Sequence, residues 1–179
     1  MIETIRIGRL LREAVAAPYR NLVTRPTGAA VRSRIEATLA RSNCGTALLD
    51  FSDIELVDLS CADEVVAKLL LAGDRARCCF VLQGLREDHH EAIDHVLSHH
   101  RLAVAAVPPG GCEFRLLGWV PPDAREVFAC ICDRGPLTAG DVSRVLQWSE
   151  VRSREALLQL ALRRLVRTAG DLYQPLPTT

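Results

Sequence analysis

The five histidines of this 179-residue chain all lie within twelve residues, between His89 and His100. Within that segment Glu91, His95 and His99 repeat every four positions, so a helix would place them on one face. Imidazole and carboxylate groups at this spacing suit zinc or nickel. The alternative is a solvated polar face, because such clusters are commonly exposed. We expect no metal site, and keep Glu91, His95 and His99 as the one metal candidate.

The seven cysteines include no CxxC pair. Cys130 and Cys132 are two positions apart on a predicted helix, so they cannot jointly ligate one ion. Cys78 and Cys79 are adjacent on a predicted strand and face opposite sides. Core filling is the expected role of most of these side chains. The chain also has no P-loop, no GxGxxG and no Ser/His/Asp arrangement, so we expect neither catalysis nor a cofactor.

Positive charge is concentrated in one segment, although the chain has 22 basic and 22 acidic side chains in total. Residues 151–168 carry five arginines against one acid, Glu155, which gives this segment a charge of +4. On a helix in a DNA major groove, such arginines contact base edges and phosphates. The candidate DNA-binding residues are Arg152, Arg154, Gln159, Arg163, Arg164 and Arg167.

The elements that would position these residues form two modules. Residues 1–118 alternate strand-like and helix-like segments. Strand-like runs occupy about 2–7, 46–51, 78–82, 102–107 and 113–117, and residues 54–57 continue the second run after a polar break. Helical periodicity covers about 10–15, 31–39, 62–70 and 87–100, and a turn at 108–111 separates the last two strands. This alternation predicts an α/β domain.

Residues 119–179 form the second module, beyond a boundary at residues 118–122. A helix begins near Pro122, and Thr138 and Asp141 form a capping box that opens a short second helix. A longer helix spans about 150–166, followed by a turn and a short strand at 172–174. This order is typical of a winged helix-turn-helix. The predicted inward side chains of the long helix are Leu158, Ala161, Leu162 and Leu165, opposite the arginine face.

A family resemblance is carried by the segment LLDFSDIELVDLSCADEVVAKLL. Asp50, Ser52, Asp58 and Ser60 stand at positions similar to those of the STAS domains of anti-sigma-factor antagonists. A closer resemblance is to the STAS-like family, through Asp50-Phe51-Ser52 and the run Ser60-Cys61-Ala62-Asp63-Glu64. The segment TRPTGAAVR also resembles that family's approach to its first long helix. The resemblance covers about residues 20–107 and implies a mixed sheet with packed helices.

The resemblance implies that Ser60 accepts a phosphate from a partner kinase, or lies where that partner docks. A phosphate at a helix N-terminus would meet free N–H groups and the positive end of the helix dipole. Asp58, Asp63 and Glu64 would complete the docking surface. The alternative is structural, because Ser60 and Asp63 are spaced as a capping box. Leu59 and Cys61 depart from the family pattern, and the nearby acids would repel a phosphate.

These observations favour a non-enzymatic bacterial regulatory protein, in which a STAS-like partner-binding or sensing domain is coupled to a DNA-binding winged helix for transcriptional control. The alternative is a protein-protein interaction module, an antagonist or scaffold for an ATP-binding kinase-like partner, whose winged helix does not bind DNA. No apolar run is long enough to span a membrane, and the N-terminal residues are charged throughout. We therefore expect a cytoplasmic protein without a membrane partner, and a homodimer is compatible with both hypotheses.

Overall fold

The computed structural model describes residues 1–72, 78–108 and 113–178. The chain divides into two compact units, Met1–Trp119 with Thr178, and Val120–Pro177, and each is described by itself. Of the turn predicted at 108–111, only Pro108 lies within the described residues, and Cys112 also lies outside them.

A five-stranded mixed sheet forms the centre of the first unit. Its strands are β1 (Ile2–Arg6), β3 (Thr46–Asp50), β5 (Cys79–Gln83), β6 (Ala103–Val107) and β7 (Arg115–Gly118), which lie in that order. The first four are parallel, and β7 runs antiparallel to β6. All five residues of β6 are buried, as is typical of central strands in α/β proteins. The predicted α/β class is confirmed.

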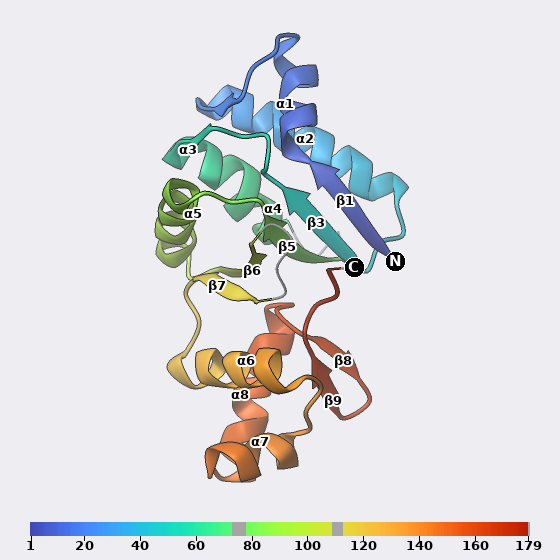
Figure 1. The fold of residues 1–179 in the computed structure, drawn as a ribbon, viewed down its shortest axis with the longest axis vertical. Coiled ribbons are helices and arrows are strands. Elements are labelled where there is room, and N and C mark those ends of the chain that lie inside the picture. Colours follow the sequence, from blue (N-terminus) through green and yellow to red (C-terminus); the bar gives the residue numbers. More distant parts are fainter. Residues whose placement is uncertain (73–77, 109–112, 179) are drawn as a thin grey trace. The chain divides into compact units, whose positions relative to one another are not determined.

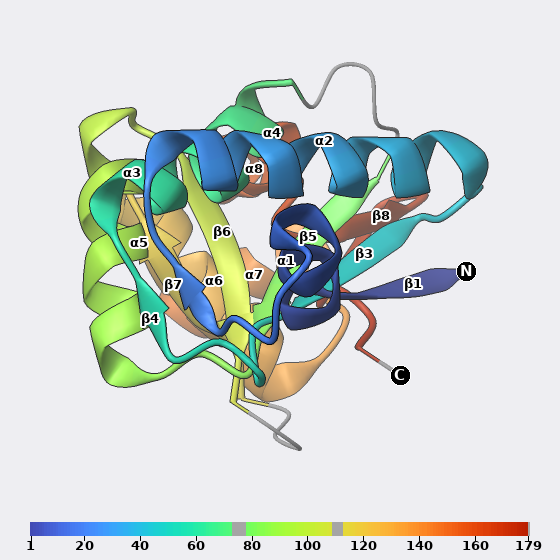
Figure 2. The same ribbon diagram turned by 90° about the horizontal axis from the view of Figure 1, so that it is seen from above.

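The helices of this unit are α1 (Ile7–Val15), α2 (Arg25–Arg41), α3 (Leu59–Cys61), α4 (Lys68–Leu71) and α5 (Glu87–His99), with a π-helix, η1 (Ala62–Ala67), between α3 and α4. They lie on one face of the sheet (Figures 1 and 2). Right-handed crossovers between strands that follow chain order place every connecting helix on the same side. The helix predicted over 62–70 is therefore present, but its first half has π geometry.

Residues 54–57 do not continue the strand that precedes them, and that prediction is wrong. The chain turns after β3, where the Ile54 amide donates to the Phe51 carbonyl at 2.8 Å. The next strand, β4 (Leu56–Val57), pairs instead with β2 (Asn21–Leu22) in a separate two-stranded parallel sheet. This turn moves the segment after β3 away from the main sheet and over the helix layer.

The second unit contains α6 (Pro122–Arg134), α7 (Ala139–Leu146), α8 (Glu150–Leu162) and a hairpin of β8 (Arg167–Ala169) and β9 (Leu172–Gln174). The capping box of α7 is confirmed, since the Thr138 hydroxyl accepts from the Asp141 amide and the Asp141 carboxylate accepts from the Thr138 amide. Backbone bonds between Leu137 and Tyr173 attach β9 to the segment before α7. The core includes Val127, Phe128, Ile131, Leu157 and Leu160.

Candidate functional site

Asp58 organises the segment that carries Ser60, between β4 and α3. It is the N-cap of α3, where its Oδ1 accepts from the Cys61 amide at 2.7 Å and from the Ser60 hydroxyl at 2.9 Å. Its Oδ2 accepts from the Thr24 amide at 3.0 Å. Burial raises the pKa of Asp58, but these hydrogen bonds outweigh it and hold the pKa below its ordinary value. The carboxylate is thus fixed and ionised.

The capping box predicted between Ser60 and Asp63 is absent, and that alternative is wrong. The cap is Asp58, two residues earlier, because a carboxylate is a stronger acceptor of amide hydrogens than a neutral hydroxyl. Ser60 instead donates to that carboxylate from within the first turn. Asp63 faces elsewhere, with Oδ2 at 2.8 Å from Arg25 Nη1 and Oδ1 at 2.9 Å from His100 Nε2.

Glu64 lies in the interior, with only 3% of its side chain exposed. Arg25 Nη1 lies 2.8 Å from its Oε1, Arg32 Nη2 lies 3.5 Å from its Oε2, and the Lys68 ammonium contacts Oε1 as well. Burial raises the pKa of Glu64, but hydrogen bonds from Lys68 and Arg25 outweigh this effect and hold the pKa below its ordinary value. Glu64 therefore joins α2 to η1 and is not available to a docking partner.

Close packing of α2 on η1 explains why Gly28 stands opposite Glu64. A Cβ at position 28 would lie 2.9 Å from the Cβ of Glu64 and 3.1 Å from the Cys61 sulfur. Only a residue without a side chain allows this approach. π-Helical segments such as η1 are frequent at functional sites, and here the π-helix carries the carboxylate that three cations surround.

Apolar side chains are exposed beside Ser60. Leu56 on β4 is 46% exposed and Leu59 at the start of α3 is 52% exposed. Ser60 itself is half-buried. The accessible part of this segment is therefore more apolar than acidic, because Asp58, Asp63 and Glu64 are all engaged within the unit.

The histidines of α5 have separate roles. His89 is buried; its Nδ1 accepts from the Arg86 amide at 3.2 Å, so Nε2 carries the proton and donates to the Glu55 carbonyl at 3.1 Å. This imidazole links α5 to the residue before β4. Burial lowers the pKa of His90, and the neighbouring Arg115 lowers it further.

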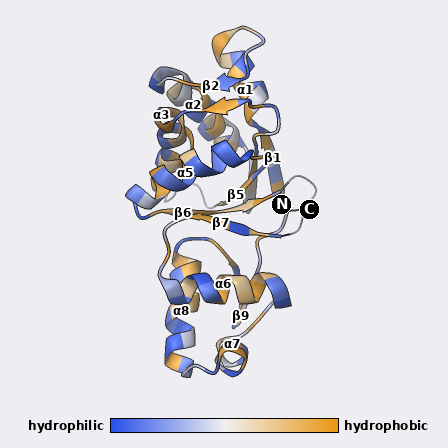
Figure 3. Ribbon diagram, turned by 60° about the vertical axis from the view of Figure 1, so that its left-hand side comes forward, coloured by the Kyte–Doolittle hydropathy of each residue, from blue (hydrophilic) through white to orange (hydrophobic). Residues whose placement is uncertain are grey.

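The three members of the metal candidate, Glu91, His95 and His99, are exposed on α5. Figure 3 shows the ribbon of this helix as largely hydrophilic. Within residues 1–72, 78–108 and 113–178, no group of three or more His, Cys, Asp or Glu side chains is arranged to hold a metal ion. The exposure of the three side chains is compatible with the solvated polar face.

The inward face predicted for α8 is wrong at Leu158 and Leu162, whereas Leu165, beyond the end of α8, is buried as predicted. Leu158 and Leu162 are 51% and 68% exposed, whereas Ala156, Leu157 and Leu160 are buried. The buried stripe also contains Ser153, whose hydroxyl donates to the Ser149 carbonyl at 3.1 Å. Because serine is polar, a pattern of apolar residues does not identify position 153 as part of the core. Val151, 66% exposed, lies on the same outer stripe as Leu158 and Leu162.

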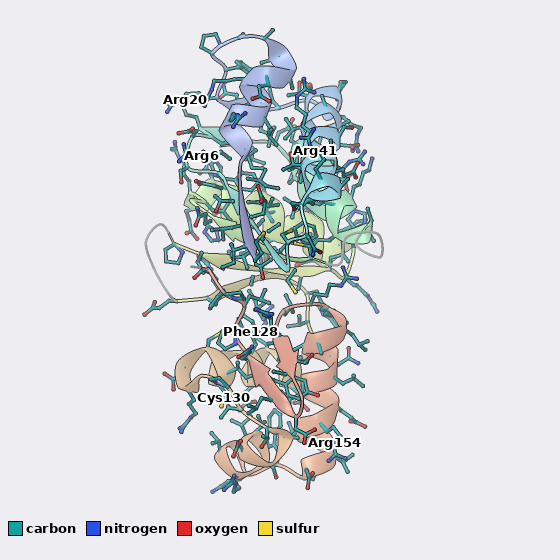
Figure 4. The ribbon with its side chains drawn as sticks, turned by 90° about the vertical axis from the view of Figure 1, so that its right-hand side faces the viewer. Arg6, Arg20, Arg41, Phe128, Cys130 and Arg154 are labelled. Carbon is teal, nitrogen blue, oxygen red and sulfur yellow. The ribbon has the colours of Figure 1, made fainter. Side chains whose placement is uncertain are left out.

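The predicted DNA-binding arginines are engaged to different degrees. Arg152 forms two hydrogen bonds of 2.7 Å with the Asp123 carboxylate on α6, and its guanidinium lies 3.9 Å from the Trp148 ring centroid. Arg154 pairs with Glu150 at 2.6 Å while its side chain stays 66% exposed, at the outer side of α8 (Figure 4). Asp123 and Glu150 both lie outside segment 151–168, so their two negative charges reduce its local +4 to +2.

The remaining candidates lie at the end of α8 and beyond it. Arg163 is the C-cap residue, and its guanidinium contacts the side-chain oxygen of Gln159. Arg164 comes next with a φ of 55°, in the left-handed region that turns the chain out of the helix. Arg167 is exposed in β8. Arg164 and Arg167 therefore lie beyond α8, whereas Gln159 and Arg163 follow Arg152 at intervals of seven and eleven positions on its helix.

No family model, curated protein or solved structure matches this chain. In the part of the chain that the structure describes, no helix has both the length and the apolar character needed to cross a bilayer. A function for the chain is therefore inferred from the geometry of its two units.

Proposed function

We propose that the chain is a non-enzymatic regulatory protein that acts by binding a protein partner, and that α8 serves this binding instead of reading DNA. The observation that carries the proposal is the outer face of α8. Val151, Leu158 and Leu162 are exposed there on one helix face, with the exposed Arg154 and Glu155 between Val151 and Leu158. Burial of an apolar helix face against another protein is energetically favourable. Contacts with phosphates and base edges are instead made by hydrogen-bonding and charged groups.

The internal contacts of Arg152 support the same proposal. In a DNA-reading helix the residues of its first half approach base edges. Here Arg152 is already satisfied by Asp123 and stacks on Trp148, so DNA would have to compete with an internal bidentate pair. The acidic Glu150 and Glu155 lie in the same half of α8 and are exposed, which further weakens attraction to phosphate.

The order of the sheet supports a role other than catalysis. Ligands of open α/β sheets bind where the strand order reverses, at the carboxyl ends of the strands. Among the described strands of this unit, β1, β3, β5 and β6 follow chain order, so the sheet has no such switch point between them. We propose that the unit is STAS-like and binds its partner, an ATP-binding kinase-like protein, at the exposed surface of Leu56, Leu59 and Ser60.

For Ser60 we propose contact with the partner in place of phosphate transfer. Its hydroxyl already donates to Asp58, and a phosphate would stand beside that ionised carboxylate. Intact-mass measurement after incubation with ATP and the partner kinase tests this point. Addition of a phosphate to wild type that is lost in Ser60→Ala would establish Ser60 as a phosphoacceptor instead.

DNA binding is the second candidate function, favoured by one observation. The helices α6, α7 and α8 and the hairpin β8–β9 occur in the order of a winged helix-turn-helix, and Arg154 and Arg167 are exposed. Such a unit binds DNA either as a monomer or as a homodimer on paired half-sites. We also propose a cytoplasmic location, since the described cysteines are free thiols.

A titration of labelled random-sequence duplex DNA with the full chain separates the two functions. Fluorescence anisotropy is measured at low and at moderate salt, for wild type and for Arg154→Ala. The protein-binding function predicts no salt-dependent complex in either protein. Binding that weakens steeply with salt, with a smaller salt dependence in Arg154→Ala, would instead identify α8 as a DNA-binding helix.

A further inference from the structure

Two buried thiols meet at the amino ends of neighbouring strands in the first unit. Cys44 lies two residues before β3 and Cys78 one residue before β5, and their residues are 8% and 2% exposed. Their sulfur atoms are 2.8 Å apart. The mechanism of partner binding uses neither side chain.

The backbone holds these thiols together. The Cys79 amide donates to the Gly45 carbonyl at 3.0 Å, immediately beside both cysteines. The ladder then continues from the pairing of Thr46 with Cys79. The backbone thus keeps the two cysteines on neighbouring segments of the sheet, and the rotamers of their side chains bring the sulfurs to this distance.

The other described cysteines are placed differently. The Cys61 thiol donates to the Thr24 carbonyl at 3.0 Å, where α2 packs on α3. Cys130 and Cys132 are two positions apart on α6 and face different directions. Cys79 is the first residue of β5 and directly follows Cys78, and successive side chains of an extended chain point to opposite faces.

We propose that Cys44 and Cys78 are a reversible oxidation site that closes to an intrachain disulfide in the presence of a peroxide. Bond formation requires the sulfurs to approach by only about 0.8 Å from their separation of 2.8 Å. The bond would join the starts of β3 and β5. It would also close a loop that contains the Leu56, Leu59 and Ser60 surface.

The reaction consumes one hydrogen peroxide for each disulfide. One sulfur attacks a peroxide oxygen, the O–O bond breaks, and a sulfenic acid and water form. The second sulfur then attacks the sulfenic sulfur, the S–O bond breaks, and the hydroxyl leaves as water with the remaining thiol proton. Two electrons pass from the two sulfurs to the peroxide.

The site is protected from fast oxidation. Burial raises the pKa of the Cys78 thiol, and the hydrogen bond with Cys44 raises it further. The nucleophilic thiolate is therefore scarce. We expect disulfide formation to take place over a longer time than oxidation of an exposed, acidic thiol.

The test is peptide mapping of the native full chain after treatment with hydrogen peroxide and alkylation. The expected product is one cross-linked peptide pair containing Cys44 and Cys78, two hydrogens lighter than the reduced peptides and separated again by dithiothreitol. The oxidised chain should also melt at a higher temperature, because the bond restricts the unfolded state. Cys44→Ala and Cys78→Ala should each abolish the cross-link, and Cys61→Ala should retain it.

Two results would overturn the proposal. One is separate alkylation of Cys44 and Cys78 in the oxidised wild type, and the other is a bond from either of them to a different cysteine. Because these readouts come from the wild-type protein, they hold even where a variant fails to fold. Cys79→Ala separates bonding within the Cys78-Cys79 dipeptide from the bond between Cys44 and Cys78, which this variant should leave intact.

Discussion

Glu64 is the residue whose environment differs most from its appearance in the sequence. Asp63 and Glu64 are adjacent acids that look like one exposed acidic surface. In the structure Asp63 remains near the surface beside His100, and Glu64 is enclosed by cations from α2 and α4. Successive helical residues point in different directions, and the partner arginines lie 32 and 39 residues away in the chain. No local pattern predicts such pairs.

Replacement of this carboxylate tests its structural role. Glu64→Gln should lower the free energy of unfolding by about 1.5 kcal/mol, since it removes a buried charged acceptor from the partly exposed Arg25 and Lys68. Urea denaturation measures the change. Glu36→Gln is the matched control, because Glu36 pairs with the same Arg32 from a more exposed position and should change stability by less than about 0.5 kcal/mol. Equal effects of both variants would contradict an interior role for Glu64.

Lowering the pH should reduce the stability that Asp58 and Glu64 provide. The pKa values of Asp58 and Glu64 are lowered in the folded chain, so the unfolded chain binds protons first as pH falls. Their stabilisation is complete above the ordinary values of 3.8 and 4.5 and is lost as pH falls through the lower folded-state values. Urea midpoints measured from pH 6 to pH 3 should therefore decline in wild type and decline less in Glu64→Gln. An equal decline of the urea midpoint in wild type and in Glu64→Gln would show that folding does not lower the pKa of Glu64.

In helix α8, two different sets of residues have the spacing of a buried face. Leu158, Leu162 and Leu165 have helical spacing and are all leucines, so periodicity selects them as the core. The buried stripe is made of Ser153, Ala156, Leu157 and Leu160, two of which are small and one of which is polar. Only the tertiary packing of α6 and α7 on α8 distinguishes the stripes, because intrinsic periodicity is the same for both.

Adjacent leucines on α8 provide a matched pair of variants. Leu157→Ala removes a fully buried side chain and should lower the free energy of unfolding by about 3 kcal/mol. Leu158→Ala removes a half-exposed one and should change it by less than about 0.5 kcal/mol. Chemical denaturation of both variants gives the comparison. A larger loss of stability from Leu158→Ala than from Leu157→Ala would support the buried face that the sequence pattern predicts.

The connection between α6 and α8 also makes a prediction. Arg152 joins Asp123 through two hydrogen bonds, whereas Arg154 and Glu150 form a single contact within α8. A double-mutant cycle on stability should give a larger favourable coupling for Arg152 with Asp123 than for Arg154 with Glu150. No difference between the two cycles would mean that Arg152 is available to an external ligand.

At the scale of the whole molecule, the sequence predicts which segments form strands and helices better than it predicts their neighbours. Central strands such as β6 are continuous apolar runs, and the Thr138 cap has a local signature, so both are recognisable within a short window. The pairing of β4 with β2 and the enclosure of Glu64 depend on residues more than thirty positions apart. The motif around Ser60 therefore indicates where the candidate site lies, but not which of its side chains are exposed.

The two units also explain why total charge is a poor guide to the partner. A chain with 22 basic and 22 acidic side chains conceals a basic segment, and that segment is in turn partly neutralised by Asp123 and Glu150. Val151, Leu158 and Leu162 are exposed on α8 as well. Under the proposed function these three side chains, and not the arginines around them, contact the protein partner.

The most direct test of protein binding through α8 places a photo-crosslinking benzoylphenylalanine at position 158 of the full chain in its native cells. The matched control places it at position 144, where Arg144 is exposed on α7. We predict adducts from position 158 that are protein, resist nuclease and disappear when Leu162→Glu is added, with no such adducts from position 144. Adducts that contain DNA and are removed by nuclease, or adducts no more abundant than those from position 144, would contradict protein binding through α8.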